Sequence, residues 1–176
     1  MTLTRLGSRL AAMALGTSAL GGTCSEAPPL HDVSGTWVNA SWGPEGKVTL
    51  ERSGADAPVD LDVAMAVTSA LPIDRTPLPV EGTVCVKEAE GLGLAGTYVI
   101  DAARSTWAGS DYGGARLDIV ARTSDGRVIE VQQAFMYNAR PDVLADAVWV
   151  FRSATAEALG AVRFEGLRKD AAARCP

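Results

Sequence analysis

The sequence predicts an all-β domain: an antiparallel, up-and-down barrel of about eight strands, with a β-sandwich as the alternative. From Val33 onward, apolar residues recur with a period of two and not with the helical period of about 3.6. Short runs rich in Gly, Asp, Ser and Pro separate these segments. Strands with a single apolar face need closure to cover their edges and to share one core.

The clearest alternation runs from Val59 to Val67, where five apolar residues are separated by Asp60, Asp62 and two alanines. A second pair of runs, 115–122 and 127–138, flanks Ser124-Asp125-Gly126, which is typical of a hairpin turn. Trp107 is expected in a shorter strand before that hairpin. The other expected strands cover the ranges 33–40, 46–52, 79–87, 92–101, 145–153 and 160–168.

Helix is expected only at residues 154–159, as a turn or two between the last two strands. The segment 69–78 cannot be regular helix, because Pro72 and Pro77 lie within it and Pro79 follows.

The first residues predict export from the cytoplasm. Arg5 and Arg9 precede an uncharged run that ends at Gly22, and this run is too short to span a bilayer. We therefore predict a signal peptide at 1–23, a proline-containing tether at 24–32 and one β-domain at 33–176.

Cys24 follows the apolar run at the position where bacterial lipoproteins carry their acylated cysteine, and the leader resembles such a signal. The resemblance implies a lipid anchor at Cys24. Ordinary cleavage near Ala19-Leu20-Gly21 is the alternative. Ser25 follows in place of the aspartate that retains similar proteins at the inner membrane, which favours outer-membrane delivery with the domain facing the periplasm.

The chain has three cysteines, and an oxidising compartment favours pairing. Lipidation of Cys24 leaves Cys85 and Cys175 as one possible disulfide. Alternation with Val84 and Val86 places the Cys85 thiol on the outer wall, where the C-terminal tail can reach it.

Removal of residues 1–23 leaves 14 basic and 21 acidic residues, a net charge of −7. This balance argues against nucleic acid and anionic lipid headgroups as electrostatic partners, since no basic cluster is available to neutralise phosphates. Membrane contact is therefore expected through the lipid.

Three short stretches resemble the calycins, the group that includes lipocalins and avidins. They are Gly35-Thr36-Trp37-Val38-Asn39, Leu94-Ala95-Gly96-Thr97-Tyr98 and Trp149-Val150-Phe151-Arg152-Ser153. The resemblance implies a barrel that opens with an inward Trp37 and an inward Asn39. Biotin is not implied, because the serine and the late acidic contact of the avidin pocket have no equivalent near Gly43 or Gly166.

Polar residues sent inward by alternation suggest a small-molecule pocket. Gln133 alternates with Ile129, Val131, Phe135 and Tyr137 and is therefore expected inside, where a buried amide needs partners. The predicted ligand-binding set combines hydrogen-bonding groups with aromatic walls. Its members are Asn39, Tyr98, Gln133, Tyr137 and Trp149. The alternative interpretation of the aromatic residues is plain core packing.

Catalysis is not expected. The one histidine, His31, lies in the tether, so Ser-His-Asp and Cys-His arrangements lack a positioned base. No cluster has the spacing of metal ligands, and no cofactor motif is present; Asp60 and Asp62 share a solvent-facing side of their strand.

Two hypotheses remain. In the first, the barrel binds a small apolar or amphipathic ligand in the cell envelope. In the second, the interior is filled and the outer face engages another envelope protein, for example as an inhibitor or an assembly accessory. A void lined by the predicted set favours the first hypothesis, and a solid interior favours the second.

Overall fold

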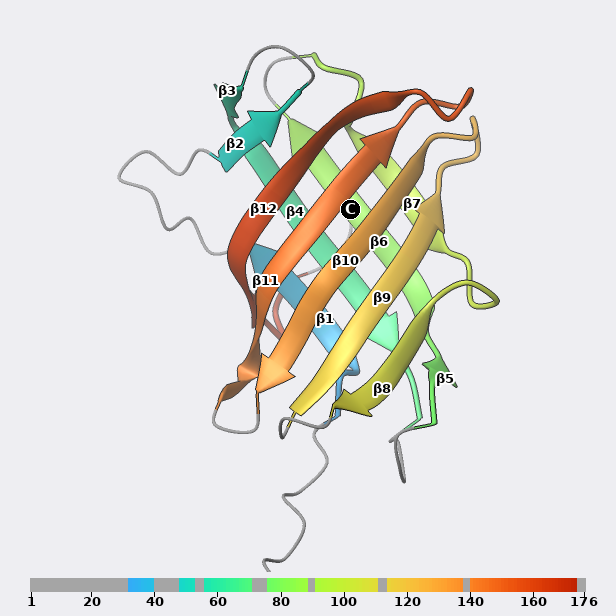
Figure 1. Ribbon diagram of the computed structural model, residues 1–176, viewed down its shortest axis with the longest axis vertical. Helices are drawn as coiled ribbons and strands as arrows, with labels where there is room; N and C mark the ends of the chain where they lie inside the picture. Colours follow the sequence, from blue (N-terminus) through green and yellow to red (C-terminus); the bar gives the residue numbers. More distant parts are fainter. Residues whose placement is uncertain are drawn as a thin grey trace, which may run out of the picture.

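Antiparallel strands make up the regular structure of the described part of the chain (Figure 1). The computed structural model describes residues 32–39, 48–52, 56–70, 76–88, 91–110, 114–137 and 140–173. The strands are β1 (Gly35–Asn39), β2 (Val48–Glu51), β3 (Ala57–Val59), β4 (Leu61–Thr68), β5 (Leu78–Pro79), β6 (Glu81–Glu88), β7 (Gly96–Ile100), β8 (Thr106–Ser110), β9 (Gly114–Arg122), β10 (Val128–Tyr137), β11 (Arg140–Arg152) and β12 (Ala158–Lys169).

Eight strands close into a ring in the order β1-β4-β6-β7-β9-β10-β11-β12, and β1 pairs with β12 to complete it. The order around the ring is the order along the chain, which is the topology of an up-and-down barrel. The predicted barrel is confirmed. The sandwich alternative is wrong, because the first and last strands of one sheet pair with each other instead of facing a second sheet.

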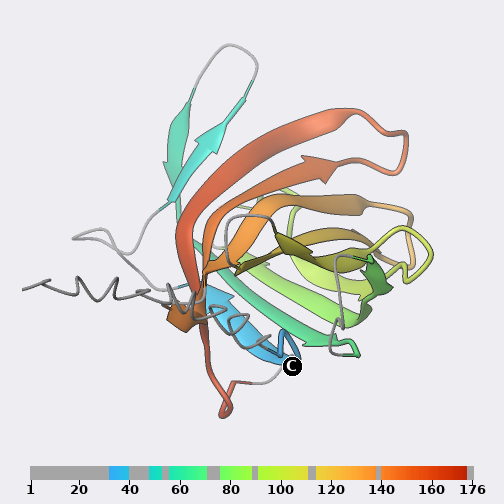
Figure 2. The same ribbon diagram turned by 60° about the horizontal axis from the view of Figure 1, so that its bottom comes forward.

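The remaining strands are additions to this ring. β2 and β3 form a hairpin that pairs with β12 beyond the reach of β1, and Figure 2 shows this hairpin projecting from the barrel. β8 pairs with the first half of β9, while β7 pairs with its end. β5 pairs with the outer edge of β8. The added strands β2 and β8 therefore pair with β12 and β9 at residues that β1 and β7 leave unpaired.

Alternation of apolar and polar residues explains the strands as expected. In β4 the apolar side chains from Leu61 to Val67 are buried, and those between them are exposed or half-buried. In β9 the residues at Ala115, Leu117, Ile119 and Ala121 are buried in the same way. One face of each strand thus supplies the core.

The helix expected at 154–159 is wrong, because this segment is a hairpin turn between β11 and β12. Ala156 donates its N–H to the carbonyl oxygen of Ser153, and Ser153 donates to that of Glu157 at 2.8 Å. Ala156 takes a left-handed conformation with φ of 65°. A segment this short cannot offset the cost of helix nucleation, whereas the two long strands on either side favour a tight reversal.

Candidate functional site

The interior of the ring is occupied by one continuous cluster of buried apolar side chains. The three largest are the indoles of Trp37, Trp107 and Trp149, each essentially inaccessible to solvent. Trp149 packs edge-on against Phe164, with 5.3 Å between the ring centroids. The side chains that point into the barrel therefore pack against one another and fill its interior.

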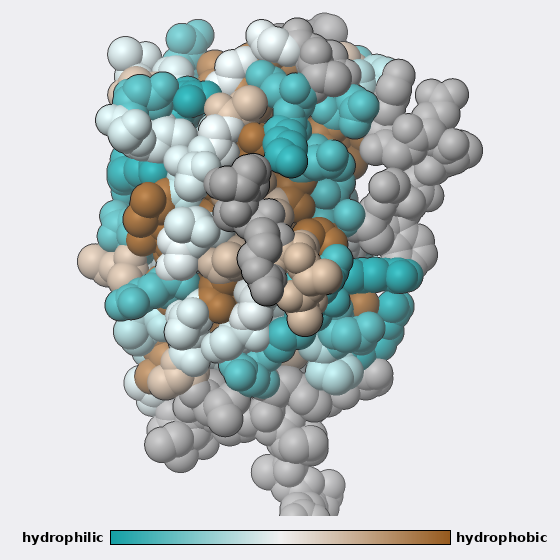
Figure 3. Space-filling view, turned by 180° about the vertical axis from the view of Figure 1, so that it is seen from behind, coloured by the Kyte–Doolittle hydropathy of each residue, from teal (hydrophilic) through white to brown (hydrophobic). Residues whose placement is uncertain are grey.

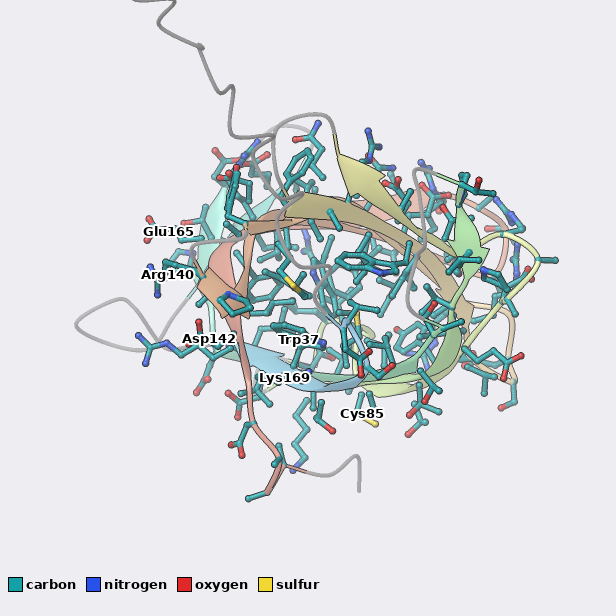
Figure 4. All side chains as sticks on the ribbon, turned by 90° about the horizontal axis from the view of Figure 1, so that it is seen from below. Trp37, Cys85, Arg140, Asp142, Glu165 and Lys169 are labelled. Atoms are coloured by element: carbon teal, nitrogen blue, oxygen red, sulfur yellow. The ribbon has the colours of Figure 1, made fainter. Side chains whose placement is uncertain are left out.

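The lower end of the barrel in Figure 1, where β1 begins, is closed by Trp37. Its indole N–H donates to the carbonyl oxygen of Val33 at 2.8 Å, and Val33 is itself part of the buried core. The Lys169 ammonium lies 5.5 Å from the centre of the indole ring and donates to the carbonyl oxygen of Asp32. Figure 4 shows Trp37 and Lys169 close together in a view of this end. The inward Trp37 is thus confirmed.

The upper end of the barrel is closed by the segment before β7, which places Leu94 in the core. The Glu88 carboxylate accepts hydrogen bonds from the backbone N–H groups of Gly93 and Leu94. The Arg127 guanidinium donates to the carbonyl oxygens of Gly93 and Ala95 at 2.7 and 2.9 Å. Side chains from β6 and from the turn before β10 therefore hold this segment over the opening.

Tyr98 of the predicted set belongs to this closure. Its hydroxyl donates to the carbonyl oxygen of Leu94 at 2.6 Å, and its ring is buried beneath the Arg127 guanidinium, 5.9 Å from the ring centroid. Burial raises the pKa of the Tyr98 phenol. The hydrogen-bonding group expected to orient a ligand is occupied by the backbone.

Asn39 lies at the end of β1 and bonds to the neighbouring strand β4. Its amide NH2 donates to the carbonyl oxygen of Leu61, and its amide oxygen accepts from the N–H of Val63, both at 2.9 Å. The pairing of β1 with β4 ends one residue earlier, at Val38 and Ala64. Asn39 therefore continues the ladder with its side chain.

The inward position expected for Gln133, Phe135 and Tyr137 is wrong. Gln133 is exposed and adopts a left-handed backbone with φ of 55°, and the register of β10 against β9 shifts between Val131 and Ala134. This bulge adds one residue and reverses the alternation, because side chains along a strand face opposite sides in turn. Ala134 and Met136 fill the core, and Tyr137 is 46% exposed.

The same reversal crosses the two neighbouring strands. Asp146 of β11 also adopts a left-handed backbone, with φ of 54°, and the register of β11 against β10 and β12 does not shift at this level. In β12 the alternation of buried and exposed residues also changes phase, between Phe164 and Leu167. Three adjacent strands therefore change phase together, which keeps their pairing intact.

The reversal creates an exposed feature that strict alternation does not predict, here called the ledge and defined as Phe135, Tyr137 and Arg140. The two aromatic rings stack with centroids 6.4 Å apart. Beside them lies a hollow of about 350 Å³ whose remaining walls are mostly apolar. It is lined by Tyr137, Arg140, Val143, Ala145, Glu165 and Gly166. A period-two pattern that ignores bulges could not reveal this surface.

Trp149 and Trp107 each bury an indole N–H without a hydrogen-bond acceptor. Both side chains contribute to the core cluster, from β11 and β8 respectively. Buried donors of this kind are uncommon in folded proteins.

The five residues of the predicted ligand-binding set do not surround one pocket. Tyr98 and Trp149 are inside the barrel, Asn39 is in the wall between β1 and β4, and Gln133 and Tyr137 are outside.

Cys85 lies on the outer side of β6, as its alternation predicts, and Figure 4 shows its sulfur directed away from the barrel. It is only 4% exposed, and its sulfur lies 3.9 Å from the Thr97 hydroxyl. A hollow of about 270 Å³ includes both Cys85 and Ala173, so the C-terminal segment returns to this wall. Cys24 and Cys175 lie outside the described residues, and the pairing of Cys85 stays a prediction.

Figure 3 shows the rear of the molecule, over β1, β4 and β6, as a mixed surface of polar and apolar groups. Asp60 and Asp62 border a shallow hollow there with Lys87 and Glu88. Within the described ranges, no group of three or more His, Cys, Asp or Glu side chains is arranged to hold a metal ion. The same residues include no helix of the length and apolarity that crossing a bilayer requires.

Comparisons with protein-family models, with curated proteins and with solved structures found no match to this chain.

Proposed function

We propose that this chain is an exported, lipid-anchored protein of the cell envelope that acts as a protein-interaction module through the outer surface of a filled barrel. The observation that carries the proposal is the continuous buried cluster inside the ring. Closure of the lower end by Trp37 and of the upper end by the Leu94 segment adds to it. A barrel filled in this way offers its outer wall and loops to a partner.

The proposal of export and anchoring is supported by the sequence. Arg5, Arg9 and the uncharged run before Cys24 resemble a lipoprotein signal, and Ser25 favours the outer membrane with the barrel in the periplasm. Mass spectrometry of the chain isolated from envelopes tests this part. An N-terminal diacylglycerol-cysteine at Cys24 is the expected result, and an unmodified N-terminus near Leu20 would contradict it.

We also propose that the barrel is calycin-like. The strand that carries Gly35-Thr36-Trp37 opens a ring of eight strands in chain order, and its tryptophan closes one end. These features support a calycin-like barrel without identifying a ligand.

A binding assay separates a filled barrel from a ligand carrier. Native mass spectrometry of the envelope-purified chain is expected to give the mass of the polypeptide and its anchor alone. An apolar fluorescent probe is expected to remain unbound. Phe151→Ala is the matched control, because Phe151 is fully buried and its truncation leaves an apolar cavity that accepts small apolar molecules. A stoichiometric small molecule bound to the parent chain would refute the filled-barrel proposal.

Photo-crosslinking in intact cells tests the protein-interaction part. A photoreactive residue is placed at Val99, which is 61% exposed on β7, or at Arg163 on β12, also exposed. The matched control is the buried position Leu117. We expect an adduct of one discrete mass from an outward position and none from Leu117. Absence of adducts from every outward position would contradict an interaction module.

Interior ligand binding is the second candidate, and the unpartnered indole N–H groups of Trp107 and Trp149 favour it. Each needs an acceptor, which a ligand oxygen or a buried water supplies. In that case a bound molecule with a carbonyl or hydroxyl oxygen is expected, and Trp149→Phe weakens its binding more than Trp37→Phe does, since the Trp37 N–H is already bonded to Val33.

A further inference from the structure

The end of the barrel that faces the proposed anchor is the lower end. The described chain begins at Asp32, whose carbonyl oxygen accepts from Lys169 beside Trp37. Only seven residues lie between Cys24 and Asp32 in the sequence, and a chain of that length reaches roughly 25 Å when fully extended. An acyl group at Cys24 therefore holds this end of the barrel near the bilayer.

The ledge lies at the same end. Tyr137 pairs with Gly114, the first residue of β9, and with Arg140, the first residue of β11. The start of β1 is at this end as well, where Thr36 accepts a hydrogen bond from Asp170 just after β12. Figure 1 shows the end of β10 and the beginnings of β1, β9 and β11 together at the bottom of the barrel.

The chemistry of the ledge fits the headgroup region of a bilayer. Tyrosine concentrates there because its ring is apolar and its hydroxyl remains hydrated. Tyr137 is exposed and stacks on Phe135, and Arg140 stands beside the apolar hollow with a charged end and an apolar stem. Figure 4 shows Arg140, Asp142 and Glu165 on this rim, so both signs of charge are present.

We infer that the ledge of Phe135, Tyr137 and Arg140 is an interfacial contact surface, which rests on the headgroup region of the membrane that anchors the chain. The inference depends on the acylation of Cys24 in the proposed function. The tether keeps the bilayer at a high local concentration, so a small contact that is weak by itself is occupied. Because the rim has mixed charge and the chain is acidic, aromatic burial drives the contact and anionic lipid is not required.

Quenching by brominated lipid tests this orientation. The acylated full chain with Tyr137→Trp is reconstituted in phosphatidylcholine vesicles with or without bromine on the acyl chains. Val99→Trp is the matched control: Val99 pairs with Arg122, at the end of β9 opposite to Gly114. The parent chain sets the background of native indoles. We expect brominated lipid to reduce the added emission of Tyr137→Trp and to leave that of Val99→Trp unchanged.

Replacement of part of the phosphatidylcholine by phosphatidylglycerol is expected to leave the quenching unchanged, and a strong increase would overturn the aromatic origin of the contact. Equal quenching, or none, at both positions in a chain whose acyl group is confirmed by mass would overturn the inference and leave the anchor in place. Lack of the acyl group would remove the anchor itself. Self-association in detergent that Tyr137→Ser abolishes would assign the ledge to a second copy instead of the membrane.

Discussion

The side-chain amide of Asn39 takes the place of a strand beside Leu61. It donates to the Leu61 carbonyl oxygen and, through its own oxygen, accepts from the next N–H that points the same way, that of Val63. β1 ends at this residue, while β4 continues beyond its partner. One side-chain amide therefore bonds to a backbone acceptor and a backbone donor of β4 that have no partner strand beyond the end of β1.

Asn39→Ala is expected to destabilise the fold by about 1–3 kcal/mol, because it leaves two half-buried backbone groups without partners. Asn39→Asp keeps the acceptor for Val63 and loses the donor for Leu61, so it recovers only part of this loss. Urea unfolding measures the effect. Thr49→Ala, an exposed change on β2, is the control, with an expected change within about 0.5 kcal/mol. Equal stability of Asn39→Ala and the control would show that the two hydrogen bonds of Asn39 contribute nothing to the stability of the fold.

The left-handed backbone at Gln133 predicts an unusual response to glycine. Gln133→Gly is expected to be neutral or to stabilise by up to about 1 kcal/mol, because glycine adopts positive φ without steric cost. Gln132→Gly is the matched control in the same strand and is expected to destabilise by roughly 0.5–1 kcal/mol. Thermal or urea unfolding distinguishes the two. A larger loss at Gln133 than at Gln132 would contradict the assigned bulge.

Tyr98→Phe removes the hydrogen bond to Leu94 while it keeps the buried ring. The expected loss of stability is about 0.5–1.5 kcal/mol. The pKa of this phenol is raised by burial, so the stability it contributes is present below its ordinary value near 10 and is lost as the pH rises through the raised value. The parent is expected to be more stable than Tyr98→Phe at neutral pH, and this difference in stability is expected to shrink at alkaline pH. Unfolding curves of both proteins at the two pH values measure it. A constant difference would oppose this assignment.

Acid is expected to loosen the turn between β9 and β10. The Thr123 hydroxyl and then the Arg127 guanidinium lower the pKa of the Asp125 carboxyl to about 2. A lowered pKa gives stability that is present above the ordinary value of 3.8 and is lost as the pH falls toward 2. Carbon-detected titration of the Asp125 carboxyl and amide exchange at Arg127 measure this window. Asp125→Asn is expected to remove the pH dependence of that exchange, and its persistence would assign it elsewhere.

The proposed Cys85–Cys175 disulfide is expected to add about 2–4 kcal/mol, because it closes a loop of about 90 residues in the unfolded chain. Ala173 and Cys85 line the same hollow on the outer wall, which supports this pairing. Intact mass before and after reduction with alkylation measures the thiols. Cys85→Ser and Cys175→Ser are expected to lose the same stability, and two free thiols in the oxidised chain would refute the link.

Much of the fold could be predicted because the same rule applies along most strands. In β4 and β9, alternation alone identifies the buried face, and local turns pair neighbours in sequence. The rule fails where the backbone adds a residue. The left-handed positions are Gln133 and Asp146, and neither is a glycine that would mark a bulge. Alternation therefore does not reveal the phase change and predicts Tyr137 inside.

The candidate site was less predictable than the fold. Alternation predicts which way Asn39 and Tyr98 point and does not predict what they meet. Leu94 is the partner of Tyr98 because a segment folds over the barrel end. Glu88, five residues before Gly93, and Arg127, 34 residues after it, hold that segment in place. Hydrogen bonds from side chains to the backbone of a connecting segment leave no periodic trace in a single sequence.

Closure of the ring through β1 and β12 has a consequence for how the molecule acquires its structure. Trp37 and Lys169 pair across nearly the whole domain, whereas most other ring pairings join consecutive segments. A chain that emerges N-terminus first therefore remains an open, curled sheet until its final strand arrives. During that interval two unpaired borders face solvent, and intermolecular pairing competes with self-completion, so productive maturation depends on keeping such intermediates apart.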